Sequence, residues 1–145
     1  MDKTTALIAK HEGMRLKPYT DSVGKLTIGY GRNLEDVGIS PTEANAMLKA
    51  DVATAYDEAS QFEWFWDLND PRQSAIVNMV FNMGLPTFKE FTNTLIFLAQ
   101  GDYESAADEI LRGTGPGGRS RWYVQVGSRA EEVSEILRTG GWPDE

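Results

Sequence analysis

The chain has 145 residues, no cysteine, and 22 acidic against 14 basic residues, which gives a formal net charge of −8. This length suits one domain with a sizeable core, and it is long enough for two lobes. The negative charge argues against nucleic acid as a partner, because phosphates demand a basic surface. The absence of cysteine excludes disulfides and thiol chemistry. The longest apolar run, Leu95 to Ala99, is far too short to insert into a membrane.

The first elements are predicted by their caps and periodicity. Residues 2–11 favour a short helix that begins at the N-cap Asp2 and stops at Gly13. A turn-like segment, 20–24, then precedes the alternating run 27–31, which is typical of a strand.

Helices dominate the remainder of the chain. Ser40 and Glu43 form a capping box with proline at the first helical position, and apolar residues then recur at three and four up to about residue 60. A second helix opens at Asp70 in the same way and ends at Gly84. Further helices are predicted over residues 88–100, 103–112 and 129–138. One short sheet followed by many helices indicates an α+β fold.

Three residues near the start, Glu12, Asp21 and Thr27, would suffice for the chemistry of a glycoside hydrolase. Taken alone, the two acids are equally explained as ordinary surface charges among the 22 acidic residues of the chain. Hydrolysis of a glycosidic bond needs one acid to protonate the leaving oxygen and a second to help a water attack. Glu12 lies at the carboxyl end of the predicted helix, where the dipole disfavours a negative charge, and this suits a proton donor. Asp21 is expected in a solvated turn as the base, and the Thr27 hydroxyl is expected to hold the water. Because that water faces Glu12 across the bond, the expected outcome is inversion.

The segments around these residues resemble one known family. The stretch EGMRLKPYTDSVGKLTIGYG, the helix segment IVNMVFNMG, and the later FTNTL, SRWYVQ, SRA and RTGGW follow one another in that family's order. They are similar to the phage-type lysozymes, or endolysins, of glycoside hydrolase family 24, which are typified by the T-even phage enzyme. The resemblance implies a single lysozyme-like domain over residues 1–145. It has a small sheet lobe over about 13–40, a connector helix over about 41–60, and a larger helical lobe over about 61–145 that includes the N-terminal helix.

The resemblance also implies an activity and its setting. We expect a muramidase that hydrolyses the β-1,4 bond between N-acetylmuramic acid and N-acetylglucosamine in peptidoglycan, without metal or cofactor, as a monomer. The N-terminus lacks the apolar core of a signal peptide. We therefore expect the protein in the host cytoplasm, from which a separate membrane-opening protein, a holin, gives access to the wall. Two alternatives remain open, a lytic transglycosylase and a non-catalytic wall-binding phage structural protein.

Matching the family residue by residue adds substrate-binding positions. These are Asn33, Phe81, Thr94, Gln125 and Arg129. For Phe81 and Thr94 a purely structural role in the core is an equal alternative.

One ion pair is predicted at the junction of the lobes. Arg32 stands where the type member has a histidine, and the partner of that histidine matches Asp51 here, on the apolar stripe of the connector helix. A carboxylate that faces a core needs a partner. The sequence thus predicts an Arg32–Asp51 pair.

The basic residues are distributed unevenly, with five arginines in the last third, Arg112, Arg119, Arg121, Arg129 and Arg138. They either pair with local acids or form a basic rim to a cleft.

Overall fold

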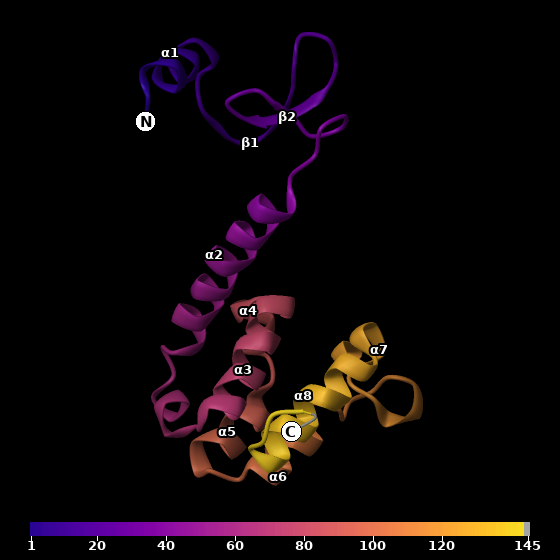
Figure 1. Ribbon diagram of the computed structural model, residues 1–145. Coiled ribbons are helices and arrows are strands. Elements are labelled where there is room, and N and C mark those ends of the chain that lie inside the picture. Colours follow the sequence, from indigo (N-terminus) through magenta and orange to yellow (C-terminus); the bar gives the residue numbers. More distant parts are fainter. Residues whose placement is uncertain (144–145) are drawn as a thin grey trace. The chain divides into compact units, whose positions relative to one another are not determined.

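The computed structural model describes residues 1–143 and divides into two compact units (Figure 1). We call residues 1–47 the sheet unit and the residues from Leu48 onward the helical unit. A small three-stranded antiparallel sheet in one unit and a set of helices in the other confirm the predicted α+β class. The predicted placement of the N-terminal helix in the helical lobe stays a prediction.

The sheet unit begins with helix α1, Lys3–Glu12. Asp2 caps it as predicted, since its carboxylate accepts a hydrogen bond of 2.8 Å from the Thr5 N–H. The helix ends where Gly13 adopts a φ of +72°, and the N–H of this glycine closes the last turn on the Ala9 carbonyl. Glu12 is therefore the last residue of the helix.

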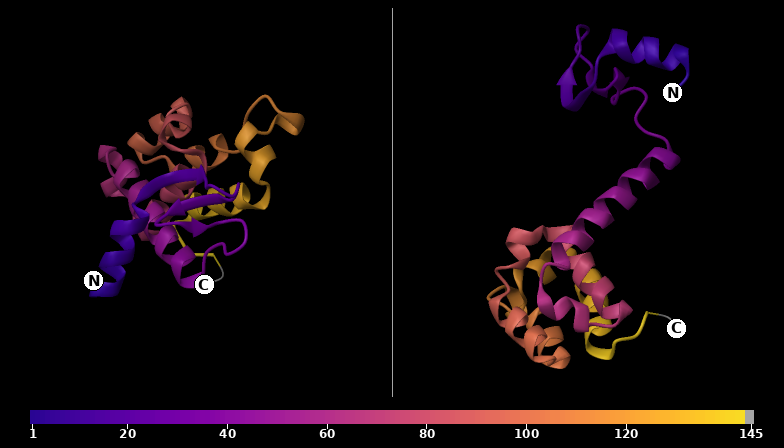
Figure 2. Two further views of the ribbon diagram at one scale, coloured as in Figure 1. Left: turned by 90° about the horizontal axis from the view of Figure 1, so that it is seen from above. Right: turned by 90° about the vertical axis from the view of Figure 1, so that its left-hand side faces the viewer.

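The sheet has strands β1 (Arg15–Thr20), β2 (Leu26–Gly29) and β3 (Arg32–Asn33), in that spatial order. Both pairings are antiparallel, and the ribbons of β1 and β2 lie side by side in Figure 2. The register sets Tyr19 opposite Thr27 and Ile28 opposite Arg32.

Helix α2, Pro41–Ala59, begins in the sheet unit and ends in the helical unit. The predicted capping box is present in both directions. The Glu43 N–H donates to the Ser40 hydroxyl at 3.1 Å, and the Ser40 N–H donates to the Glu43 carboxylate at 2.9 Å.

Short helices build the helical unit around a buried core. They are η1 (Glu63–Asp67), α3 (Asp70–Met83), α4 (Leu85–Phe88), α5 (Thr92–Gln100), α6 (Tyr103–Glu109), η2 (Pro116–Gly118), α7 (Arg121–Val126) and α8 (Ser128–Thr139). The largest side chains with almost no exposed surface are Phe65, Ile76, Met79, Phe88, Leu98, Ile110 and Leu137. Helix α3 supplies five of the buried apolar side chains, as its mostly apolar sequence predicts. Within residues 1–143, no helix combines the length and the hydropathy that crossing a bilayer requires.

Helix boundaries differ from the sequence prediction at three places. Helix α3 is capped by Asn69, whose side chain accepts from the Arg72 N–H, so the cap is one residue earlier than Asp70. The helix predicted over 103–112 ends at Glu109. The helix predicted over 88–100 begins only at Thr92, as α5, because a separate short helix, α4, ends at Phe88. Gly84 turns the chain at a φ of +84°, and Pro86 fits the first turn of a new helix because it needs no N–H donor there.

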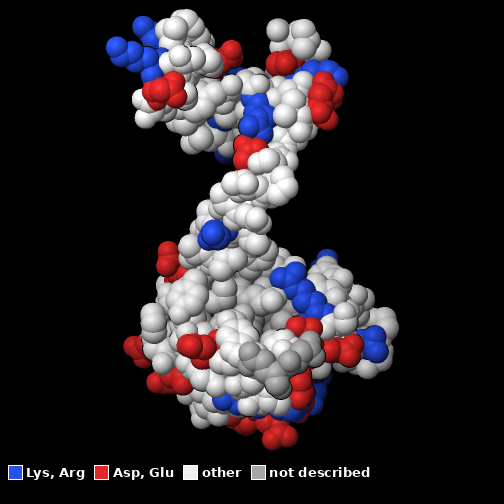
Figure 3. Space-filling view, in the orientation of Figure 1, with Lys and Arg blue, Asp and Glu red and all other residues white. Residues whose placement is uncertain are grey.

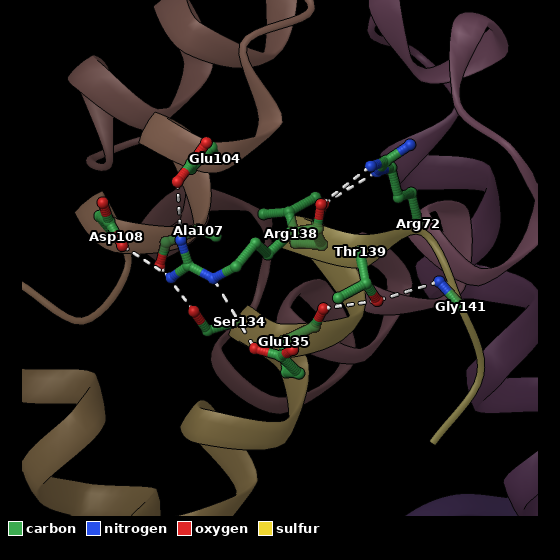
Figure 4. A network of polar contacts seen from close by, with 10 residues as sticks. Arg72, Glu104, Ala107, Asp108, Ser134, Glu135, Arg138, Thr139 and Gly141 are labelled. Carbon is green, nitrogen blue, oxygen red and sulfur yellow. Dashed lines mark hydrogen bonds and ion pairs between the residues drawn. The ribbon is translucent and has the colours of Figure 1, made fainter. Parts of the chain in front are cut away.

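The C-terminal end of α8 is held by two arginines (Figure 4). Arg138 lies within 4 Å of three acids, Glu104, Asp108 and Glu135, with the shortest contact, 2.6 Å, to Asp108. Arg72, from the first turn of α3, donates to the carbonyls of Leu137 at 2.8 Å and Arg138 at 3.1 Å. These last carbonyls of a helix have no partner within it, so Arg72 supplies the missing donors.

We predict that Arg72→Ala destabilises the protein by about 2 kcal/mol, because hydrogen bonds from a charged donor contribute roughly 1.5–3 kcal/mol. The Arg72 guanidinium also lies over the Tyr103 ring at 4.2 Å. Arg112→Ala is the matched control, since the Arg112 side chain is 69% exposed and its one ion pair is 3.8 Å long. Urea unfolding midpoints measure both. Equal shifts for the two variants would show that the Arg72 contacts contribute no more to stability than an exposed arginine does.

Candidate active site

Two of the three predicted catalytic residues are joined through one backbone oxygen. The Lys25 carbonyl accepts a hydrogen bond of 2.9 Å from the Asp21 N–H and another of 2.8 Å from the Thr27 hydroxyl. Asp21 directly follows β1, and Thr27 lies in β2. The turn between these strands therefore fixes the base and the hydroxyl relative to each other.

The Asp21 carboxylate is itself held by the same turn. Its Oδ1 accepts from the Val23 N–H at 3.0 Å and from the Lys25 N–H at 2.8 Å. Side-chain bonds of this kind to nearby N–H groups are the reason aspartate favours turns. Since both bonds use Oδ1, the other carboxylate oxygen remains available to accept a proton within the sheet unit.

The Thr27 hydroxyl has a defined orientation. The residue is 2% exposed, and its hydroxyl proton is committed to the Lys25 carbonyl. A hydroxyl that donates its only proton to a carbonyl presents just its lone pairs to any further partner. Thr27 can thus accept a hydrogen bond from a water molecule but cannot donate one to it.

Glu12 approaches the sheet from the end of α1. Its side chain is exposed, and its carboxyl lies against the turn between β2 and β3, where a Cβ on Gly31 would be 3.1 Å from Oε2. All three predicted catalytic residues thus belong to the sheet unit.

Arg32 has a partner within the sheet unit that the sequence did not indicate. The Arg32 guanidinium makes two parallel hydrogen bonds of 2.8 Å to the carboxylate of Glu43, and it also donates to the Gly38 carbonyl at 3.1 Å. The capping box directs the Glu43 carboxylate back past the start of α2, towards Arg32. Asp51 belongs to the helical unit, and the predicted Arg32–Asp51 pair stays a prediction. Hydrogen bonds from Arg32, followed by that from the Ser40 N–H, lower the pKa of Glu43 to about 2.

Asn33 has a structural role in β3. Its side-chain oxygen accepts from the Asp36 N–H and its amide donates to the Asp36 carboxylate, both at 3.0 Å. The side chain thereby closes a turn, and its part in substrate binding remains a proposal.

The other four predicted binding residues line two separate hollows of the helical unit. Thr94 and Gln125 line a cavity of about 730 Å³ between α3, α5 and α7. Thr94 is fully buried, and its hydroxyl is the one buried side-chain polar atom among the described residues without a hydrogen-bond partner. Phe81 and Arg129 line a second hollow of about 340 Å³. Phe81 is 40% exposed, so it is not a core residue.

Sequence reasoning missed two asparagines of α3 that hold side chains lining the two hollows. The Arg129 Nε donates to the Asn78 side chain at 2.8 Å, and the Trp122 indole donates to that of Asn82 at 2.9 Å. Asn78 and Asn82 are four residues apart and hence on one face of α3. Two asparagines at this spacing, in the otherwise apolar stretch over residues 75–83, are the pattern from which the sequence could have indicated them.

Pairing with local acids is confirmed for two of the five arginines. Arg138 pairs with Asp108, and Arg112 lies 3.8 Å from Glu109. Arg112 and Arg121 line the larger cavity together with Glu90 and Glu109, so a basic rim to a cleft stays a prediction. In the view of Figure 3, acidic side chains are spread over the helical unit with basic ones among them.

Two carboxyl groups and an oriented hydroxyl in one unit are the groups that hydrolysis of a glycosidic bond uses. Comparison with known proteins agrees, since the phage lysozyme family model matches residues 9–132. The endolysin of Acyrthosiphon pisum secondary endosymbiont phage 1 is 34% identical over 116 residues, which is 77% of this chain and 77% of that protein. The chain belongs to the phage lysozyme family.

Two further relatives show how the match varies in extent. A SAR-endolysin of bacteriophage PS119 is 35% identical over 113 residues, which cover 74% of this chain and 66% of that protein. The pre-baseplate central spike protein Gp5 of Enterobacteria phage T4 is 29% identical over 163 positions, covering 92% of this chain and 27% of the spike protein. The chain therefore spans about two thirds of the first relative and a small part of the second.

The Arg32–Glu43 pair predicts a particular pH dependence of stability. The folded-state pKa of Glu43, about 2, is below its ordinary value of 4.5. The stabilisation by the Arg32–Glu43 pair is therefore fully present above pH 4.5. It is lost as the pH falls towards 2, because Glu43 becomes protonated and no longer carries the charge that pairs with Arg32. Thermal melts should show a constant disadvantage of Glu43→Gln from about pH 5 to 8, which shrinks at lower pH.

Asp51→Asn on the same helix is the matched control, and we expect no such pH dependence from it. The assignment fails if the Asp51 variant shows this profile and the Glu43 variant does not.

Proposed function

We propose that this chain is an endolysin-type muramidase that hydrolyses the β-1,4 bond between N-acetylmuramic acid and N-acetylglucosamine in bacterial peptidoglycan. The observation that carries the proposal is the arrangement around the Lys25 carbonyl, which orients the Asp21 carboxylate and the Thr27 hydroxyl together. Two relatives are named endolysins, and this supports a role in lysis of a phage-infected host.

The mechanism follows from what each side chain can donate or accept. A water that donates one proton to Asp21 and the other to Thr27 keeps a lone pair free for attack on the anomeric carbon. Asp21 takes a proton from this water as general base while Glu12 gives its proton to the leaving oxygen. The water forms the new bond to carbon as the glycosidic bond breaks. The attack takes place on the face opposite the leaving group, so the configuration inverts.

The helical unit is proposed to bind the substrate away from the bond that breaks. The larger cavity presents the exposed Gln125 amide, which suits the hydroxyl and amide groups of peptidoglycan. Thr94 lines the same cavity, but its hydroxyl is buried, so its proposed contact requires that the lining moves. In the second hollow, the exposed ring of Phe81 suits the apolar face of a sugar, and Arg129 is oriented there by Asn78. In the sheet unit, Asn33 completes the proposed contacts.

The biological setting is also a proposal. We propose a monomer that is made in the host cytoplasm and reaches the wall with the help of a separate membrane-opening protein of the holin type. The SAR-endolysin relatives lead us to include release across the membrane as part of that route.

Substitutions at the three catalytic residues should abolish activity without unfolding the protein. Glu12→Gln keeps the shape and removes the transferable proton, so release of reducing ends from purified sacculi should fall by about 10²–10⁴-fold. Asp21→Ala should lose most activity as well. Thr27→Val should do the same, whereas Thr27→Ser keeps the hydroxyl and should retain most of it.

Glu35→Gln is a suitable control, because this acid of the same unit accepts from the Leu26 N–H at 2.9 Å and glutamine preserves that bond. It should remain active. Near-normal lysis by Glu12→Gln would refute the assignment of the proton donor.

A further inference from the structure

Two glycines at the end of β2 and in the turn that follows it have similar conformations but different surroundings. Gly29 and Gly31 both have positive φ, +71° and +81°, which side chains rarely adopt. A Cβ on Gly29 would meet nothing within 4 Å. One on Gly31 would be 3.1 Å from Oε2 and 3.7 Å from Cδ of Glu12. Only at Gly31 does the missing side chain leave space that another group occupies.

This contact matters because Glu12 is held differently from the other two catalytic residues. Asp21 and Thr27 are fixed by hydrogen bonds to the backbone of their turn. Within the described residues of the sheet unit, the carboxyl of Glu12 makes no hydrogen bond or ion pair. Its side chain is exposed, and its carboxyl lies close to the backbone at Gly31.

We propose that Gly31 is a positioning residue for the general acid. Its bare backbone forms the surface against which the Glu12 carboxyl rests, and this sets the position from which the proton is delivered. The inference rests on the proposed role of Glu12 as the proton donor.

The expected effect of a side chain at position 31 follows from the size of the overlap. A contact of 3.1 Å is too close for a methyl group, so the carboxyl must move by a few tenths of an ångström. Since a misplacement of 1 Å can reduce a rate by about 10²-fold, we expect Gly31→Ala to lower kcat about tenfold. KM should change little, because proton donation acts in the transition state and not in substrate binding.

Gly29→Ala is the control, since it also places a side chain at positive φ, two residues earlier at the end of β2, without touching Glu12. Both variants are assayed on soluble uncrosslinked glycan strands for kcat and KM. In parallel, the side-chain carboxyl ¹³C signal of Glu12 is followed by NMR after assignment with Glu12→Gln. We expect the loss of kcat and the displaced signal in Gly31→Ala alone. If either alanine variant is poorly folded, the pair Gly31→Asn and Gly29→Asn replaces it, because asparagine tolerates positive φ best.

The outcomes separate this inference from the proposed function. Equal losses at positions 29 and 31 would mean that backbone strain is the whole effect, and would overturn the inference. An unchanged Glu12 signal or an unchanged kcat in Gly31→Ala would overturn it too. If Glu12→Gln itself stays active, the proposed function has failed instead.

Discussion

The carbonyl oxygen of Lys25 is the atom on which the arrangement of the site depends. It accepts one hydrogen bond that closes the turn after β1 and a second that orients the Thr27 hydroxyl. A carbonyl has two lone pairs, so both bonds can form at once. The turn would close without Thr27, and the hydroxyl could rotate without the turn. Because the two hydrogen bonds share the Lys25 carbonyl as acceptor, the conformation of the turn also fixes the orientation of the Thr27 hydroxyl.

Glu43 likewise takes part in two separate interactions, at the start of α2. Its carboxylate completes the capping box with Ser40 and also accepts both hydrogen bonds from Arg32 at the edge of the sheet. One side chain thus begins the helix and joins it to β3. Both contacts favour the ionised carboxylate, and this lowers the pKa of Glu43. A neutral glutamine lacks the charge that Arg32 binds and is therefore a poor substitute.

Local signals in the sequence were sufficient for the caps and for most of the helices, whereas the catalytic roles of Glu12, Asp21 and Thr27 stay a proposal. The caps at Asp2 and Ser40 depend on residues three positions apart, so the sequence displays both halves of each interaction. The same holds for Asp21, whose partners Val23 and Lys25 follow within four residues.

The features that sequence reasoning missed depend on contacts between distant segments. The pairing of Arg32 with Glu43 depends on where the loop before α2 leads the chain. A glycine at position 31 could be read as a turn residue, but its contact with Glu12 joins segments nineteen residues apart in the sequence and appears only in the fold. The division of the binding candidates between two hollows likewise follows from helix packing.

The proposed mechanism requires that a water held by Asp21 and Thr27 attacks opposite the proton donor. Proton NMR of the first product released from soluble glycan strands, recorded before the anomers equilibrate, tests this requirement. Inversion gives a reducing N-acetylmuramic acid end in the α configuration. A β-configured product would show retention, and a 1,6-anhydro end would show that no water takes part; either result would contradict the account.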